Sequence, residues 1–126
     1  RIRILSTIDA PLLGYHIQDL LEQGCRIDAF IFDSKLMSEK DHKIHLERTS
    51  GKMPPILLDS FEQAEIPAYF VNNHNSEFCA GLVRRLDLNL LVNAGTPRIL
   101  KEGILEATSI GVLNCHPGLL PEFRGC

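Results

Sequence analysis

The sequence lacks the features that mark several large classes of protein. None of its cysteines lies in a CxxC pair, so neither a zinc site nor a disulfide framework is indicated. These cysteines are Cys25, Cys79, Cys115 and Cys126. No apolar run approaches the roughly 18 residues that a membrane span needs, and residues 1–10 lack the apolar core and cleavage site of a signal peptide. The sequence therefore predicts a cytoplasmic protein with reduced cysteines and no membrane partner.

Positive charge is also scarce. The chain has 13 Lys and Arg against 16 Asp and Glu, for a formal net charge of −3 at pH 7. Domains that bind nucleic acid normally carry a clustered basic patch. The basic residues between Lys35 and Lys52 instead alternate with Glu39, Asp41 and Glu47, which is typical of a solvated helix face. The charge disfavours a nucleic-acid partner, and the sequence leaves the oligomeric state open.

Three glycine motifs of α/β proteins are missing. The loop after the first apolar run reads STIDAPLLG, with the single Gly14 where a dinucleotide-binding protein would carry GxGxxG. Neither a GxxxxGK[ST] phosphate loop nor a GxSxG nucleophile elbow occurs. These absences disfavour a classical NAD or FAD site and a P-loop NTPase, and they exclude an α/β-hydrolase.

No metal site is expected from the histidines. His42 and His45 lie three residues apart on an expected helix, a spacing that suits metal ligation, but no third ligand accompanies them. A solvent-facing pair is the favoured interpretation. His16 and His74 are interpreted as surface or helix-face residues.

Short apolar runs alternate with helical patterns along the whole chain. The expected strands are Ile2–Ser6, Ile27–Phe32, Ala68–Val71, Leu88–Val92 and Val112–Cys115. The expected helices are Leu13–Leu21, Ser38–Ser50, Ile56–Glu65, a helix from Asn75 or Ser76 to Leu86, and Thr96–Gly103. This alternation predicts an α/β protein with an open, mostly parallel sheet and helices on both faces. The right-handed crossover rule favours a Rossmann-like arrangement. No repeat or linker interrupts residues 1–126, so one domain is expected.

Ligands of such sheets bind beyond the carboxyl ends of the strands. The loops that this rule singles out are residues 7–11, 33–36, 93–97 and 116–124. Where the last of them begins, Asn114 on the expected strand and His116 project to one side, and Pro117 restrains the backbone of His116. An amide and an imidazole so placed can stabilise the oxyanion of an acyl-transfer intermediate, and the imidazole can carry a proton. From spacing alone, an equally weighted alternative is that both side chains satisfy loop backbone groups.

The segment GVLNCHPGLLPEFRG resembles the signature of the folate-dependent formyltransferase family, G-x-x-N-x-H-x-S-L-L-P-x-x-R-G. The matching positions are Asn114, His116, Leu119, Leu120, Pro121, Arg124 and Gly125. The stretch LNLLVNAGTPRILKEGILEATSIGVLN also resembles the family's segment before its catalytic strand. The resemblance implies the family's Rossmann-like fold and transfer of a formyl group from 10-formyltetrahydrofolate to a primary amine, without a metal.

The resemblance also implies roles for individual residues. Asn114 would bind the formyl oxygen and its oxyanion, and His116 would stabilise that charge and assist proton transfer. The implied folate-binding residues are Asn93, Ala94, Arg98, Ile99 and Leu100. Within this set, Ile99 and Leu100 would flank the pterin while backbone groups around Arg98 bind its edge; plain core packing is the alternative for the two apolar side chains. The residues implied at the amine acceptor are Asp9, Tyr15 and Arg124.

The sequence departs from the family pattern in two places that matter for function. Gly118 stands where Ser is usual, and the family's third catalytic residue, an Asp, lies a few dozen residues beyond the Arg124–Gly125 pair. We therefore expect the 126 residues to be the amino-terminal part of a single formyltransferase-like domain, truncated at its carboxyl end and inactive alone.

Two other functions stay open at this stage. A hydrolase of 10-formyltetrahydrofolate would use water in place of the amine, and a catalytically silent module would only bind folate or a nucleotide. The acidic charge disfavours tRNA as the acceptor, and the missing phosphate loop disfavours glycinamide ribonucleotide. An amino sugar or another small amine is the expected acceptor.

Overall fold

The computed structural model describes residues 2–54, 65–87 and 89–115. Its strands are β1 (Ile2–Ser6), β2 (Ile27–Asp33), β3 (Ala68–Val71), β4 (Leu90–Asn93) and β5 (Gly111–Asn114). Its helices are α1 (Leu13–Glu22), α2 (Glu39–Arg48), α3 (Glu77–Arg85) and α4 (Glu102–Leu105). Within the described ranges no helix is both long and apolar enough to cross a membrane.

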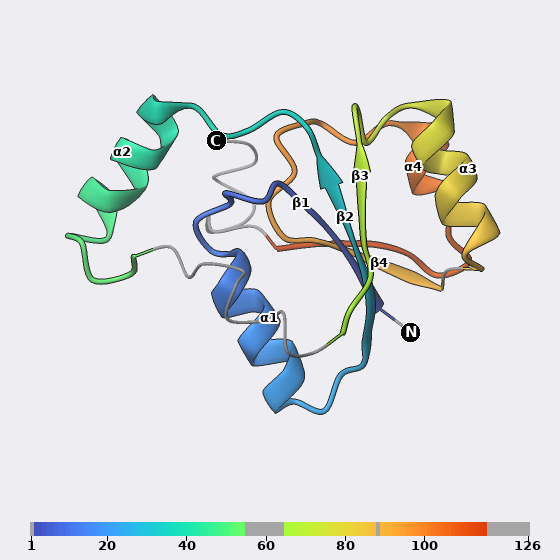
Figure 1. Cartoon of the computed structure of the whole chain (residues 1–126), viewed down its shortest axis with the longest axis horizontal. Helices are drawn as coiled ribbons and strands as arrows, with labels where there is room; N and C mark the ends of the chain where they lie inside the picture. Colours follow the sequence, from blue (N-terminus) through green and yellow to red (C-terminus); the bar gives the residue numbers. More distant parts are fainter. Residues whose placement is uncertain (1, 55–64, 88, 116–126) are drawn as a thin grey trace.

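The strands form one parallel sheet in the order β3-β2-β1-β4-β5 (Figure 1). The chain builds outward from β1 to β3, returns to the other side of β1 and continues outward to β5. Such a reversal of direction beside the first strand is the hallmark of Rossmann-like sheets. The predicted fold class is confirmed.

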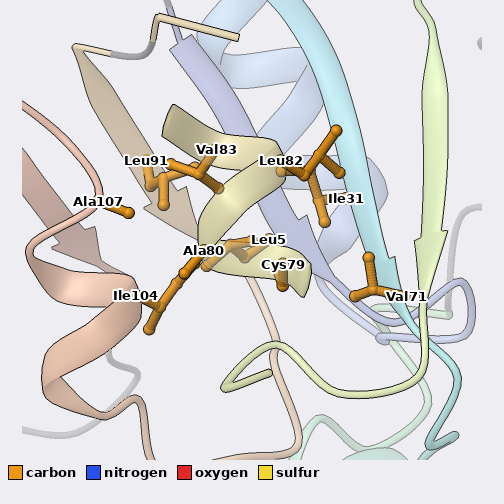
Figure 2. Close-up of a cluster of buried hydrophobic side chains, with 10 residues drawn as sticks. All are labelled: Leu5, Ile31, Val71, Cys79, Ala80, Leu82, Val83, Leu91, Ile104 and Ala107. Atoms are coloured by element: carbon orange, nitrogen blue, oxygen red, sulfur yellow. The ribbon is translucent and has the colours of Figure 1, made fainter. Parts of the chain in front are cut away.

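Helices cover both faces of the sheet. Helix α1 lies against one face and helices α3 and α4 lie against the other, whereas α2 buries none of its residues (Figure 1). Strand β2 serves both cores, because Ile31 faces the α3 side while Phe30 and Phe32 face the α1 side. Figure 2 shows the α3-side core. It comprises Leu5, Ile31, Val71, Cys79, Ala80, Leu82, Val83, Leu91, Ile104 and Ala107.

Two serines begin helices as the sequence predicts. The Ser38 hydroxyl accepts a hydrogen bond from the Asp41 backbone N–H, and the Ser76 hydroxyl accepts one from Cys79 N–H at 3.1 Å. Each bond satisfies a backbone donor that the first helical turn leaves without an intrahelical partner. The segment around residues 72–76 is thereby fixed at the end of β3, which matters for the site.

Some element boundaries differ from the prediction. Strand β4 extends to Asn93, and β5 begins and ends one residue earlier than expected. The helix expected from Thr96 begins only at Glu102. Residues 94–101 form a loop instead, because Asn93 and Asn75 side chains hydrogen-bond its backbone at both ends. Most of the expected helix Ile56–Glu65 lies outside the described residues.

Candidate active site

The carboxyl ends of the strands bring together loops that are distant in the sequence. The segments that meet there are residues 7–12, 34–38, 72–76 and 94–101, together with the end of β5. The sequence singled out the loops after β1, β2 and β4, but it missed the loop between β3 and α3.

Asn114 ends β5 directly beside Asn93 at the end of β4. The two residues are partners in the parallel register, and the Asn93 Nδ2 donates a hydrogen bond of 2.7 Å to the Asn114 Oδ1. Asn93 lies two residues after Leu91, so both amides project from the α3 side of the sheet. Asn114 is exposed. Its amide is therefore oriented by a neighbouring strand and open to a ligand.

Asn93 also fixes the start of the following loop. Its Oδ1 accepts hydrogen bonds from Gly95 N–H at 3.2 Å and from Thr96 N–H at 2.9 Å. Gly95 has φ +132°, and a Cβ there would lie 2.8 Å from the Ala10 Cβ. Glycine is required because the loop passes so close to the segment after β1. The expected folate-binding loop is thus held tightly at its first residues.

A buried ion pair holds the middle of the same loop. The Asp33 carboxylate, at the end of β2, has a fully buried side chain and accepts two hydrogen bonds from the Arg98 guanidinium. It also accepts backbone bonds from Lys35 and His74, each at 2.9 Å. The second guanidinium nitrogen, Arg98 Nη2, donates to the Asn72 carbonyl as well. This network ties the loops after β2, β3 and β4 to one another.

His74 is buried, so its prediction as a surface residue is wrong. Its Nε2 donates to the Ile31 carbonyl at 2.9 Å, and the Thr96 hydroxyl donates to its Nδ1 at 2.6 Å. Because a carbonyl oxygen can only accept, Nε2 carries a proton, and in the neutral imidazole Nδ1 is then the acceptor for the Thr96 hydroxyl. Burial accordingly lowers the pKa of His74, although the Ile31 carbonyl and Asp33 act in the opposite direction. The residue is a structural link between β2 and the loop after β4.

The charges of the ion pair follow from the same contacts. Burial by itself raises the pKa of Asp33, but the hydrogen bonds from Arg98, Lys35 and His74 outweigh it, so this pKa lies below its ordinary value. The hydrogen bond to Asp33 raises the pKa of Arg98. Asp33 and Arg98 are both ionised at neutral pH.

The end of the loop leaves one apolar side chain in solvent. Asn75 fixes the backbone here, since its Nδ2 donates to the Ile99 carbonyl at 3.0 Å and its Oδ1 accepts from Lys101 N–H at 2.8 Å. Ile99 is 90% exposed, whereas Leu100 packs against the α3-side core. The alternative of core packing therefore holds for Leu100 and is wrong for Ile99. Ala94 is buried, with its N–H donating to the Leu5 carbonyl and its carbonyl accepting from Ser6.

The two described residues expected at the amine acceptor are both bonded within the chain. The Asp9 carboxylate accepts from Met37 N–H at 3.1 Å and from His42 Nε2 at 3.3 Å. The Tyr15 hydroxyl donates to the Pro54 carbonyl at 3.0 Å. Asp9 thus braces the loop after β2, and Tyr15 connects α1 to the end of the segment that follows α2.

A cleft of about 360 Å³ opens between the loops after β2 and β4. Its lining residues are Lys35, Leu36, Met37, Ser38, Asp41, Gly95, Thr96 and Pro97. The cleft shares the expected folate-binding loop, but none of the expected site residues that the structure describes lines it. A second cleft, of about 340 Å³, lies near the amino ends of β2 and β3, against Ile27 and Pro67.

Two of the expected site residues, His116 and Arg124, lie outside the described residues. In the part of the chain that the structure describes, no group of three or more His, Cys, Asp and Glu side chains could hold a metal ion. His42 contacts Asp9, and His45 Nε2 donates to the Met53 carbonyl at 3.0 Å.

Sequence reasoning missed the role of Asp33. The available signal was a single carboxylate that directly follows a near-continuous apolar strand, in one of the loops already singled out. Such a charge needs a partner when it is buried. Arg98 directly follows another of those loops, the one after β4, and β4 lies on the other side of β1 from β2, so pairing the two residues required the order of the strands.

Comparisons with known proteins agree with this arrangement. A family model described as formyl transferase matches residues 13–126. The methionyl-tRNA formyltransferase of Rickettsia bellii is 34% identical over 64 residues, which are 51% of this chain and 21% of that protein. The enzyme of the same name from Rickettsia prowazekii is 31% identical over 86 residues, or 68% of this chain and 26% of that protein. The chain spans about a quarter of the length of these curated relatives.

A solved structure is similar over almost the whole chain. The crystal structure of glycinamide ribonucleotide transformylase 1 from Symbiobacterium toebii superposes with a TM-score of 0.60 and 26% sequence identity. The match covers 99% of this chain and 55% of that one.

Proposed function

The chain belongs to the formyl transferase family, and from that membership we propose that the protein transfers a formyl group from 10-formyltetrahydrofolate to a primary amine. The observation that carries the proposal is the exposed amide of Asn114 at the carboxyl end of β5, oriented by Asn93. We further propose that the chain is the amino-terminal part of one formyltransferase-like domain of a cytoplasmic enzyme.

The loop after β4 suits a folate. Ile99 presents an exposed apolar side chain on a backbone that Asn75 holds in place, as needed against the flat face of a pterin. The Arg98 guanidinium is occupied by Asp33, which leaves backbone groups near it to meet the polar edge of the ring. Ala94 and Leu100 are buried or packed against the core, so they support the loop rather than touch the ligand.

The chemistry needs hydrogen-bond donors at one developing charge. When the amine nitrogen attacks the formyl carbon, the carbonyl oxygen becomes an oxyanion, and Asn114 Nδ2 donates a hydrogen bond to it. The intermediate then collapses, the bond from the formyl carbon to the folate nitrogen breaks, and the proton that the amine gives up passes to that nitrogen, so that tetrahydrofolate leaves. By the resemblance, His116 assists that proton transfer.

The acceptor is proposed as a primary amine, with three candidates to be compared. Methionyl-tRNA comes first, because that acceptor stands in the names of several curated relatives. Glycinamide ribonucleotide stands in the name of the similar solved structure, and an amino sugar is the expectation from the sequence. Asp9 and Tyr15 would shape the acceptor side through the loops that they brace, and Arg124 would contact the acceptor directly.

The full-length protein tests this function with 10-formyltetrahydrofolate and each of the three amines, by following loss of the formyl donor. Formyl transfer to one amine is expected, and Asn114→Ala should lower kcat by about 10²- to 10³-fold, the usual effect of removing one oxyanion donor. Asn89→Ala, directly before the start of β4, is the matched control and should behave as wild type.

Other outcomes assign the alternatives. Formate release without any amine would indicate a hydrolase. Binding of tetrahydrofolate without turnover would indicate a silent binding module. Wild-type turnover by Asn114→Ala would contradict the proposed role of the amide.

A further inference from the structure

We propose that Asn93 is a positioning residue that sets which end of the Asn114 amide faces the formyl oxygen. This inference rests on the proposed function, because Asn114 needs a defined orientation only if its amide serves the reaction. It assigns Asn93 a task different from the folate contact that the resemblance implies for it.

An asparagine at this position has an intrinsic ambiguity. A half-turn of the amide exchanges an oxygen, which can only accept hydrogen bonds, for an NH₂ group, which can only donate them. Only the NH₂ group stabilises an oxyanion, and the oxygen would repel it. Asn114 is exposed, so solvent alone would not select between the two orientations. A fixed neighbour is needed to make the selection.

Asn93 makes that selection because its own orientation is determined. Its Oδ1 accepts hydrogen bonds from the Gly95 and Thr96 backbone N–H groups, at 3.2 and 2.9 Å. Two donors cannot face an NH₂ group, so the Asn93 oxygen must point to the loop. The Asn93 Nδ2 then points to β5, where it donates to Asn114 Oδ1 at 2.7 Å. The Asn114 Nδ2 is consequently turned away from Asn93.

The strand register keeps the two amides within reach of each other. Asn93 and Asn114 are partners in the β4–β5 ladder, and Cys115 N–H donates to the Asn93 carbonyl at 3.1 Å. Among the described residues, no side chain or backbone group accepts a hydrogen bond from Asn114 Nδ2. This donor is therefore oriented before a ligand arrives, which is the condition for strong stabilisation of a developing charge.

Two substitutions at position 93 separate orientation from mere support of the loop. Asn93→Asp keeps an oxygen for the Gly95 and Thr96 N–H groups but presents a second oxygen to Asn114, whose amide must turn over. Asn93→Ala removes every polar contact and leaves the Asn114 amide free to adopt both orientations. In the full-length protein we expect kcat to fall by about 10²- to 10³-fold for Asn93→Asp and by about tenfold for Asn93→Ala. A purely structural role predicts the reverse order, because only the alanine loses the loop contacts.

The added negative charge could also act on the oxyanion directly, and a double-mutant cycle removes that ambiguity. If Asn93 acts through Asn114, then adding Asn93→Asp to Asn114→Ala lowers kcat no further. Asn89→Asp places the same charge directly before the start of β4, near Ser109, and is the control for a general charge effect. It should leave kcat unchanged.

Two readouts do not depend on turnover. The Kd for tetrahydrofolate, which lacks the formyl oxygen, should be the same for Asn93→Asp and wild type. In ¹⁵N-edited NMR spectra of the protein without folate, the side-chain amide signals that disappear in Asn114→Ala should shift in Asn93→Asp.

The outcomes distinguish this inference from the proposed function. If wild type transfers no formyl group, or Asn114→Ala is fully active, the proposed function fails and the inference fails with it. If Asn114→Ala loses activity while Asn93→Asp keeps it, or if the two losses multiply in the double variant, the role of Asn93 is wrong and the proposed function stands.

Discussion

Replacing Asp33 by Asn tests whether the ion pair with Arg98 holds the loops at the carboxyl edge of the sheet. The two Asp33 oxygens together accept from Arg98 Nε, Arg98 Nη2, Lys35 N–H and His74 N–H. An amide has nearly the same shape but only one oxygen. In either orientation, two of these donors must face the NH₂ group, and Arg98 loses its counter-ion.

The expected loss of stability follows from this geometry. Removing one partner of a buried ion pair costs about 3–5 kcal/mol, mainly because the other charge is left without compensation. The Arg98 side chain is 23% exposed and keeps its bond to the Asn72 carbonyl. We therefore expect the low end of the range, about 3 kcal/mol, for Asp33→Asn.

Urea unfolding of the full-length protein at pH 7, followed by circular dichroism, measures this loss. Glu77→Gln is the control, since Glu77 forms an ion pair with Arg84 at 3.1 Å but is 85% exposed. An exposed pair should contribute less than about 1 kcal/mol. If the two substitutions lower the free energy of unfolding equally, the buried pair does not anchor the loops and the reasoning is refuted.

Two further predictions concern stability. Burial lowers the pKa of His74 below its value in the unfolded chain, about 6.5. The unfolded state therefore binds the proton more readily. The contribution of neutral His74 to the free energy of unfolding is full above about pH 6.5 and decreases as the pH falls toward the folded-state pKa. Urea unfolding at pH 7.0 and 5.5 should show a smaller pH effect for His74→Gln than for wild type, and identical effects would contradict the assignment. Gly95→Ala should lower the free energy of unfolding by about 1–3 kcal/mol, because the new Cβ meets Ala10 at 2.8 Å and φ is +132°. Gly103→Ala, where a Cβ meets nothing within 4 Å, is its control and should not destabilise the protein; equal losses would contradict the close approach.

Local patterns were sufficient to predict the elements of this fold. Strand β2 is a near-continuous apolar run because it is buried on both faces, and Ser76 precedes its helix at the position where a hydroxyl can cap it. Both signals depend only on neighbours in the sequence. The prediction of a helix from Thr96 was wrong, because the side chains of Asn93 and Asn75 hydrogen-bond the backbone of that segment and hold it in a non-helical conformation.

The contacts of the site could not be predicted in the same way. His74 stands in the polar stretch VNNHNS, and nothing in that stretch indicates burial. It is buried because the loops after β2 and β4 close over the end of β3, an arrangement that follows from the strand order rather than from local composition. The bond between Asn93 and Asn114 likewise depends on β4 and β5 being adjacent. The resemblance named Asn114 without indicating what orients it.

These contacts join the loop after β4 and the amide of Asn114 into one hydrogen-bonded unit. Asp33 binds the backbone of His74, the His74 ring binds the Thr96 hydroxyl, and the Thr96 backbone binds Asn93, which orients Asn114. If the ion pair failed, Thr96 would lose its fixed place and the Asn93 oxygen would lose the donors that determine its orientation. The buried carboxylate of Asp33, on a strand two positions away from β4, would then be needed to orient the amide of Asn114, although the two side chains are not in contact. Asp33→Asn should consequently lower kcat in wild type but not in the Asn114→Ala background, and equal losses in both would show that the two regions act independently.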